Sequence, residues 1–175
     1  LLTAGVTPDD PAIQKSLTYL RKLEPNETYS VALQTLVFCQ IGAASDLVRI
    51  RRNVEWLETE QVKTGNPARV GGWGYSKGRV GGDPSNSQFA LLALDAAEQR
   101  GVAVDPKVFE LAAAYWKGRQ TSSGAWAYDI AGSPPTGSMT SAGIASTVIC
   151  RGRLGDSSSK IQNGVITCCG GVREE

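Results

Sequence analysis

Gly71-Gly72-Trp73-Gly74-Tyr75 and Gly124-Ala125-Trp126-Ala127-Tyr128 are two copies of one short motif. Before each copy, a helical segment that contains an aromatic residue ends in a glutamine, Gln61 or Gln120, and an apolar run that opens with Ser87 or Ser141 follows each copy. The separations are 120 − 61 = 59 residues for the glutamines, 126 − 73 = 53 for the tryptophans and 141 − 87 = 54 for the serines. A third, weaker copy covers residues 16–36. A repeat of this length predicts stacked helical units that bury their faces on one another.

The helical segments of the sequence are of two kinds. In residues 13–20, 47–57 and 108–116 the apolar residues recur at spacings of three and four, which predicts helices with one buried face. Residues 31–41, 89–97 and 144–150 are apolar on almost every side, so we expect these helices to be covered all round. Little of the sequence alternates with the period of two that is typical of strands, so strands are expected to be minor or absent.

The alternation of the two kinds of helix predicts an all-α fold. Helices that are joined by short turns run antiparallel, so the apolar helices are expected to form an inner layer and the amphipathic helices an outer layer. The predicted architecture is an α/α toroid, or a partial toroid, of antiparallel helix pairs. Residues 157–169 are expected to add a last amphipathic segment. The chain, residues 1–175, is predicted to be one domain, and its start at Leu1 without a methionine predicts a fragment of a longer protein.

The composition argues against several classes of protein. Hydrophobic residues make up 41% of the chain and charged residues 20%, which is typical of a soluble globular protein. The 18 basic residues nearly balance the 17 acidic ones, so no nucleic-acid partner is expected. No apolar run has the length that a membrane span needs. Histidine is absent and the four cysteines lack a paired spacing, so we expect no metal site and no cofactor.

The aromatic residue, the glutamine and the Gly-x-Trp turn together resemble the repeats of the superfamily of squalene cyclases and protein prenyltransferase β-subunits. The similarity covers roughly residues 10–155, and it implies the α/α toroid. The catalytic motifs of these enzymes do not carry over. Asp83-Pro84-Ser85-Asn86 keeps one acid where cyclases have the run Asp-x-Asp-Asp, and the cysteine and histidine of the prenyltransferase zinc site have no counterpart. The Cys-Gly-Glu-Gln loop of the similar thioester domains does not occur either.

A binding site is predicted where the inner helices begin. If these helices are parallel, their N-termini gather at one end of the molecule, and each N-terminus presents unpaired N–H groups and a partial positive charge. Aromatic residues of the two turns are expected to form the rim of this site. The predicted binding residues are Tyr75, Asp83, Asn86, Ser87, Tyr128, Asp129 and Ser141. The alternative interpretation is that the hydroxyl, amide and carboxyl groups among them only cap their helices.

The leading functional hypothesis is a non-catalytic binding or scaffolding module built from prenyltransferase-like helical repeats. The alternative is an enzyme of the terpenoid-cyclase-like or polysaccharide-active toroid class, with its site at the N-termini of the inner helices. An aromatic-lined apolar interior would favour an isoprenoid, and paired carboxylates would favour a sugar. A third hypothesis is an arc that binds another protein through its ends. The compartment, the oligomeric state and the catalytic residues, if any, stay open at this point.

Overall fold

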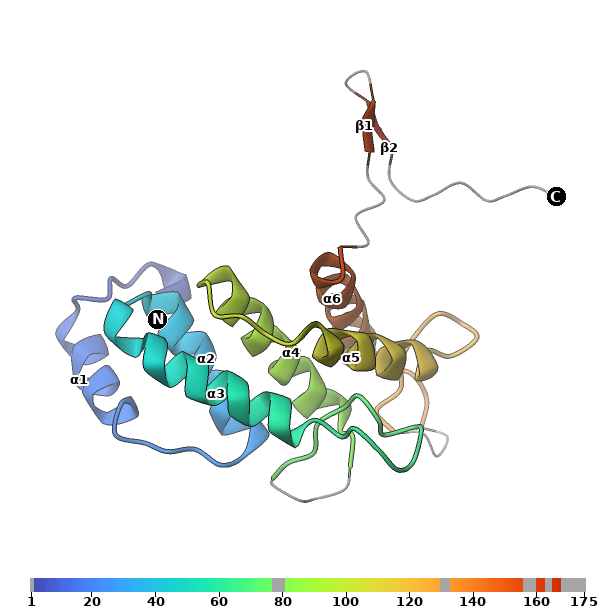
Figure 1. Ribbon diagram of the computed structural model, residues 1–175, viewed down its shortest axis with the longest axis horizontal. Coiled ribbons are helices and arrows are strands. Elements are labelled where there is room, and N and C mark those ends of the chain that lie inside the picture. Colours follow the sequence, from blue (N-terminus) through green and yellow to red (C-terminus); the bar gives the residue numbers. More distant parts are fainter. Residues whose placement is uncertain (1, 77–80, 130–132, 156–159, 163–164, 168–175) are drawn as a thin grey trace.

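The computed structural model describes residues 2–76, 81–129, 133–155, 160–162 and 165–167, and helices dominate this part of the chain (Figure 1). The α-helices are α1 (Pro11–Leu20), α2 (Thr28–Ile41), α3 (Leu47–Glu60), α4 (Pro84–Gln99), α5 (Pro106–Gly118) and α6 (Gly137–Arg153). Two 3-10 helices, η1 (Leu2–Ala4) and η2 (Ala44–Asp46), and two strands, β1 (Lys160–Gln162) and β2 (Val165–Thr167), complete the described elements. The predicted all-α class is confirmed, with strands as a minor element.

The prediction of an amphipathic segment over residues 157–169 is wrong for the residues of this segment that the structure describes. Strands β1 and β2 pair antiparallel there, with Ile161 opposite Ile166. These six residues include two isoleucines, a valine and a threonine, and β-branched residues favour strands over helices. The other residues of this segment lie outside the described part of the chain.

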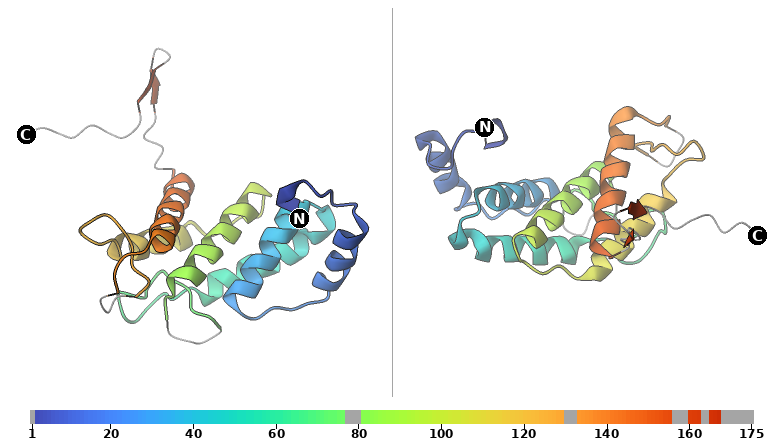
Figure 2. Two further views of the ribbon diagram at one scale, coloured as in Figure 1. Left: turned by 180° about the vertical axis from the view of Figure 1, so that it is seen from behind. Right: turned by 90° about the horizontal axis from the view of Figure 1, so that it is seen from above.

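Helices α2, α4 and α6 form a row with α4 in the middle (Figure 2). Helix α4 packs on α2 on one flank and on α6 on the other. Helix α3 packs on α2 and α4, and α5 packs on α6, so these two amphipathic helices cover the row. Helix α1 lies at the far end of the molecule from α6 (Figure 1). No helix in the described residues is both long and apolar enough to cross a membrane.

Capping aspartates define where three of the helices begin. The carboxylates of Asp10, Asp83 and Asp105 accept hydrogen bonds from backbone N–H groups in the first turns of α1, α4 and α5, and a proline follows each of them directly. Proline is tolerated there because the first N–H groups of a helix have no partner within the helix. An aspartate cap followed by a proline is therefore the common start of these three helices.

The two Trp turns of the sequence make the same hydrogen bonds. The indole N–H of Trp73 donates to Leu57 O over 2.7 Å, and the indole N–H of Trp126 donates to Trp116 O over 2.8 Å. Each tryptophan is almost completely buried between a covering helix and the row. Each turn therefore fastens a covering helix to the next helix of the row.

The glutamines that precede the turns also have matching roles. The side-chain amide of Gln61 donates to Gly71 O over 3.0 Å, and that of Gln120 donates to Gly124 O over 2.9 Å. Both glycines have a positive φ, 90° for Gly71 and 83° for Gly124, which glycine adopts without strain. The interaction of glutamine and glycine thus closes the same turn in both places.

The prediction that the apolar helices are covered all round is correct for α4 and wrong for α2 and α6. Leu91 and Leu94 of α4 are fully buried. In contrast, Leu33 of α2 is 47% exposed, and Ile144 and Val148 of α6 are 54% and 64% exposed. The reason is position, because α2 and α6 stand at the two ends of the row and each has one flank without a neighbouring helix of the row.

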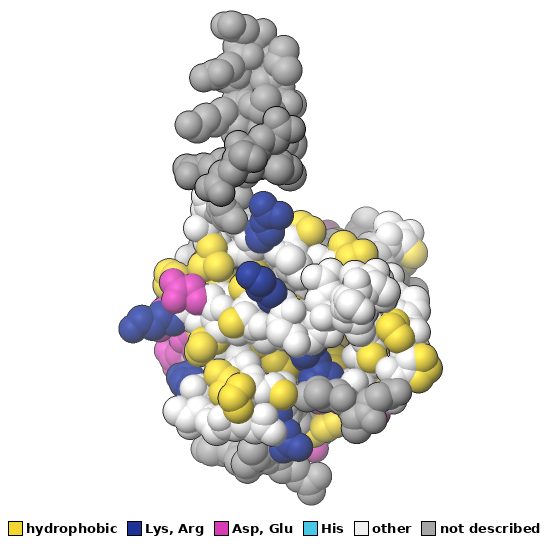
Figure 3. All heavy atoms as spheres, turned by 90° about the vertical axis from the view of Figure 1, so that its right-hand side faces the viewer, with side chains coloured by type: hydrophobic (Ala, Val, Ile, Leu, Met, Phe, Trp, Pro, Cys, Tyr) yellow, Lys and Arg dark blue, Asp and Glu magenta, His cyan; other side chains and the backbone are white. Residues whose placement is uncertain are grey.

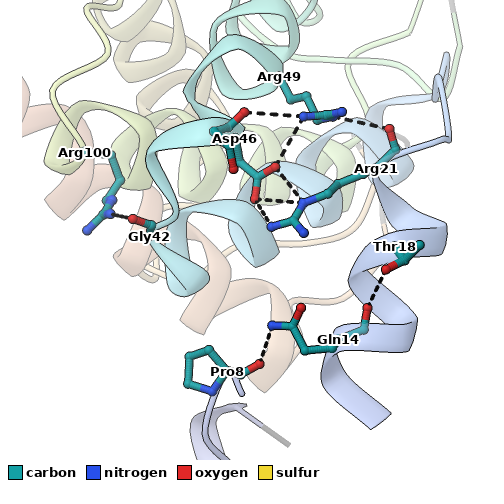
Figure 4. A network of polar contacts seen from close by, with 9 residues as sticks. Pro8, Gln14, Thr18, Arg21, Gly42, Asp46, Arg49 and Arg100 are labelled. Atoms are coloured by element: carbon teal, nitrogen blue, oxygen red, sulfur yellow. Dashed lines mark hydrogen bonds and ion pairs between the residues drawn. The ribbon is translucent and has the colours of Figure 1, made fainter. Parts of the chain in front are cut away.

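A buried carboxylate joins α1 to α3. The side chain of Asp46 has no exposed surface, and it accepts hydrogen bonds from Nε and Nη2 of Arg21 over 2.9 and 2.7 Å. Arg49 approaches the same carboxylate at 3.4 Å, and Figure 4 shows both guanidinium groups converging on Asp46. Two arginines therefore compensate one buried negative charge.

Candidate functional site

Asp83 is the centre of the polar cluster at the N-terminus of α4. Its Oδ1 atom accepts hydrogen bonds from Ser85 Oγ over 2.6 Å, from the backbone N–H of Asn86 over 2.8 Å and from Asn86 Nδ2 over 3.0 Å. Its Oδ2 atom accepts one from the hydroxyl of Tyr128 over 2.6 Å. Both carboxylate oxygens are thus occupied by donors of the chain itself.

The hydrogen bonds at Asp83 determine its charge state. Burial would raise its pKa, but hydrogen bonds from Ser85, Tyr128 and Asn86 outweigh burial and lower the pKa below the ordinary value. Burial, the hydrogen bond to Asp83 and a further interaction with Tyr75 raise the pKa of the Tyr128 hydroxyl. At neutral pH the pair is therefore a carboxylate and a neutral phenol. A general acid requires the opposite shift, because it has to keep its proton near neutral pH.

Asn86 and Ser87 are predicted site residues, and both are fully buried. The hydroxyl of Ser87 donates to Asp83 O over 2.7 Å and accepts from the backbone N–H of Trp73 over 2.9 Å. Asn86 Oδ1 has no hydrogen-bond partner, but it lies beneath the surface. Ser87 thus fastens the Trp73 turn to α4, Asn86 supports the Asp83 cap, and neither side chain is presented to solvent.

The remaining predicted site residues are Tyr75, Asp129 and Ser141. Tyr75 is 53% exposed, and its ring lies 6.4 Å from the ring of Tyr29. Asp129 accepts a hydrogen bond from the hydroxyl of Ser133 over 2.7 Å. Ser141 is exposed on α6, whereas the role that Ser87 has in the first turn is taken by Thr140, whose hydroxyl accepts from Trp126 N over 3.2 Å. The matching hydroxyls are therefore 53 residues apart, as the tryptophans are.

A polar chain continues from Tyr128 to the end of α5. The carbonyl oxygen of Tyr128 accepts a hydrogen bond from Arg119 over 2.9 Å, and the guanidinium of Arg119 lies 5.1 Å from the centre of the Tyr115 ring. The hydroxyl of Tyr115 donates to Gly82 O over 3.1 Å, and burial raises its pKa to about 12. These contacts connect the N-terminus of α4 to the C-terminus of α5.

The capping role of Asp83 predicts a pH dependence of stability. Because its pKa is lower in the folded chain than in the unfolded chain, the stabilisation is present above about pH 4 and is lost as the pH falls through the folded pKa. Asp83→Ala should lower the free energy of unfolding by about 1 kcal/mol at neutral pH, and this difference should shrink in acid. Urea unfolding at a series of pH values measures both effects.

Asp83→Asn is the matched control for this prediction. Asparagine also caps helices well, but it does not titrate. The stability of this variant should therefore fall less than that of the wild type between about pH 5 and about pH 2. Equal slopes for the wild type and Asp83→Asn would contradict the proposed titration of the cap.

A large hollow lies elsewhere, between α1 and α2, and was not predicted. It has a volume of about 1010 Å³. Its lining is mainly aliphatic and consists of Leu2, Thr3, Ile13, Lys15, Ser16, Leu17, Tyr19, Leu20, Leu23, Leu33, Leu36, Val37 and Gln40. We call it the α1–α2 groove. Tyr19, Leu23 and Leu33 are 66%, 38% and 47% exposed, so its apolar surface is open to solvent.

The position of α1 produces this groove. The side-chain amide of Gln34 in α2 donates to Leu20 O and Leu23 O over 3.1 and 3.2 Å, which fixes the C-terminal end of α1. Asn53 of α3 donates in turn to Gln34 Oε1 over 2.9 Å. Only this end of α1 is tied to α2 by side-chain hydrogen bonds among the described residues, and the apolar face of α2 beyond it lies open.

Two smaller hollows lie on the surface. One, of about 370 Å³, is lined by residues of α3 and the segment before α2, including Glu24, Glu55, Trp56 and Glu60. The other, of about 220 Å³, includes Arg119, Asp129 and Ser133. In the described part of the chain, no three His, Cys, Asp or Glu side chains come together in a way that would hold a metal ion.

Comparison with known proteins gives no relative for this chain. No protein-family model, no curated protein and no solved structure matches it. The function is therefore argued from the geometry of the described residues.

Proposed function

We propose that this chain is a non-catalytic binding or scaffolding module, and that its binding surface is the α1–α2 groove. The observation that carries the proposal is the open aliphatic surface of this groove, which is exposed at Tyr19, Leu23 and Leu33. A contiguous apolar surface of this kind is typical of a site that another molecule covers. We further propose that the helices belong to a partial α/α toroid whose repeats are similar to those of squalene cyclases and prenyltransferases.

The state of Asp83 supports a binding module over an enzyme at the N-termini of the inner helices. Its oxygens accept four hydrogen bonds from the chain, and its pKa is lowered. A carboxylate with this environment stabilises a helix and is a poor proton donor. The neighbouring Asn86 and Ser87 are buried, so they offer a substrate no polar contact.

The lining of the groove indicates the kind of occupant. Tyr19 is the only aromatic side chain in it, so the aromatic-lined space that would favour an isoprenoid is lacking in this groove. The groove runs along one flank of α2. The corresponding flank of α4 is covered by a helix of the row, namely α2 itself. An α-helix that presents an apolar stripe is the occupant that fits such a surface, because helices pack side by side through apolar ridges and grooves.

The binding of 1-anilinonaphthalene-8-sulfonate, an anionic fluorescent probe whose aromatic rings bind exposed apolar surface, tests this proposal. The wild type should enhance the fluorescence of the probe, and Leu33→Glu should weaken its binding at least tenfold, because the variant places a charge in the groove. Val48→Glu changes an exposed apolar residue on α3, 66% exposed against 47% for Leu33, and should bind the probe as the wild type does. Tyr128→Phe should also leave binding unchanged. A loss of binding in Tyr128→Phe with full binding in Leu33→Glu would instead favour the enzyme hypothesis.

A further inference from the structure

Helix α4 shows how each flank of a helix in the row is normally covered. The ring of Phe89 in α4 lies 4.9 Å from the ring of Tyr29 in α2, so the flank that carries Phe89 faces α2. Asp95 of α4 binds Arg153 of α6 over 2.6 Å, so the flank that carries Asp95 faces α6. Leu91 is one turn before Asp95 on that same flank and is fully buried. Both flanks of α4 are thus defined by contacts.

The flank of α6 that corresponds to the Asp95 flank of α4 has no covering helix in the described chain. The residues 53 positions after Leu91 and Asp95 are Ile144 and Val148. This offset is the one that relates the hydrogen-bonded hydroxyls of Ser87 and Thr140. Ile144 and Val148 are 54% and 64% exposed, and hydrophobic side chains lie at the surface of this end of the molecule (Figure 3).

The flank of α2 that corresponds to the Phe89 flank of α4 lines the α1–α2 groove. The helix caps Glu27 and Asp83 are 56 residues apart, and each accepts the first backbone hydrogen bond of its helix over 2.9 Å. The same offset relates Phe89 to Leu33, which is 47% exposed and lines the groove. The two ends of the row are therefore complementary. The open flank of α2 corresponds to the flank by which α4 packs on α2, and the open flank of α6 corresponds to the flank by which α4 packs on α6.

We infer that the α1–α2 groove receives helix α6 of a second copy of this chain. The contact continues the interface by which α4 packs on α2 and α6 packs on α4, with Ile144 and Val148 of one copy against Leu33 and Val37 of the next. The lengths agree, because α6 has 17 residues, α4 has 16 and α2 has 14. Such an interface joins two different surfaces, so association is head to tail and each copy keeps one free end.

This inference rests on the proposed role of the groove, and the oligomeric state in solution tests it. In sedimentation equilibrium, the average mass of the wild type should rise with concentration to at least twice that of the monomer. Leu33→Glu spoils only the groove, and Val148→Glu spoils only the flank of α6. Each variant alone should stay monomeric. Circular dichroism checks that both variants fold, and Val48→Glu on α3 should associate as the wild type does.

Mixing the two variants gives the decisive result. Leu33→Glu keeps an intact α6 flank and Val148→Glu keeps an intact groove, so an equimolar mixture should form a one-to-one dimer that does not grow further. A wild type that stays monomeric at every concentration, or a mixture that stays monomeric, overturns the inference. If the groove still binds the fluorescent probe in a Leu33-dependent way, the proposed binding function survives that failure. If Leu33→Glu changes neither property, both proposals are wrong.

Discussion

Replacing Arg21 with methionine is expected to lower the free energy of unfolding by about 3 kcal/mol. Methionine preserves much of the apolar stem of the side chain, but it removes the three hydrogen bonds to Asp46. That carboxylate has no exposed surface, and it would keep only Arg49, whose Nη1 lies 3.4 Å away. A buried charge that loses its main partner is costly because no water replaces the lost contact. Denaturation with urea measures the change.

Arg52→Met is the matched control for this variant. Arg52 also forms an ion pair, at 3.2 Å, but its partner Glu24 is 85% exposed. Water solvates that carboxylate after the substitution, so the loss should stay below about 1 kcal/mol. The double variant Arg21→Met with Asp46→Leu should recover much of the stability, because it removes the stranded charge. A double variant less stable than Arg21→Met would show that the buried charge is not the cause.

Gly143→Ala is expected to destabilise the chain by about 2 kcal/mol, although alanine is the better helix former. Gly143 lies in α6 directly against the indole of Trp126, and a Cβ atom there would come within 2.6 Å of Cε2 and 2.7 Å of Cε3. The ring is rigid and 5% exposed, and its N–H is held by Trp116 O. Either α6 or the whole Trp126 turn would have to move. Thermal unfolding measures the loss.

Gly152→Ala, in the same helix, should have the opposite sign. No atom lies within 4 Å of the position that its Cβ would take. The higher helix propensity of alanine should then raise stability by about 0.5 to 1 kcal/mol. Stabilisation by both substitutions would mean that α6 does not approach Trp126 as closely as the structure shows.

The features that follow from neighbouring residues were predictable from the sequence. Asp-Pro pairs at positions 10, 83 and 105 indicate helix starts because a cap and its N–H donors lie within three residues. The two turns are recognisable because their glutamines and tryptophans recur. The position of the matching hydroxyl in α6 was one residue off, since Thr140 and Ser141 are adjacent hydroxyl residues and only the bond to Trp126 N distinguishes them.

The features that were not predicted depend on long-range contacts. Tyr128 and Asp83 were expected at one site, but the hydrogen bond that joins them across 45 residues was not, and neither was the pairing of Arg21 with Asp46 across 25 residues. No local pattern indicates that the carboxylate of Asp46 is buried. The α1–α2 groove depends on how α1 is placed against α2. The apolar run of α2 shows that a partner is needed, but it does not show that one flank stays open.

The first Trp turn carries six more residues than the second, and this surplus has an evolutionary consequence. In the first turn Val62 N donates to Gly72 O and Gly71 N donates to Val62 O, and in the second Thr121 and Gly124 make the same pair of bonds with Ala125 and Thr121. The surplus residues lie between Val62 and Gly71, within the loop that these bonds close. Lengthening a closed loop costs little, about 0.6 kcal/mol for each doubling. Insertions and deletions at this edge should therefore be well tolerated, which leaves it open to variation while the helices stay in register.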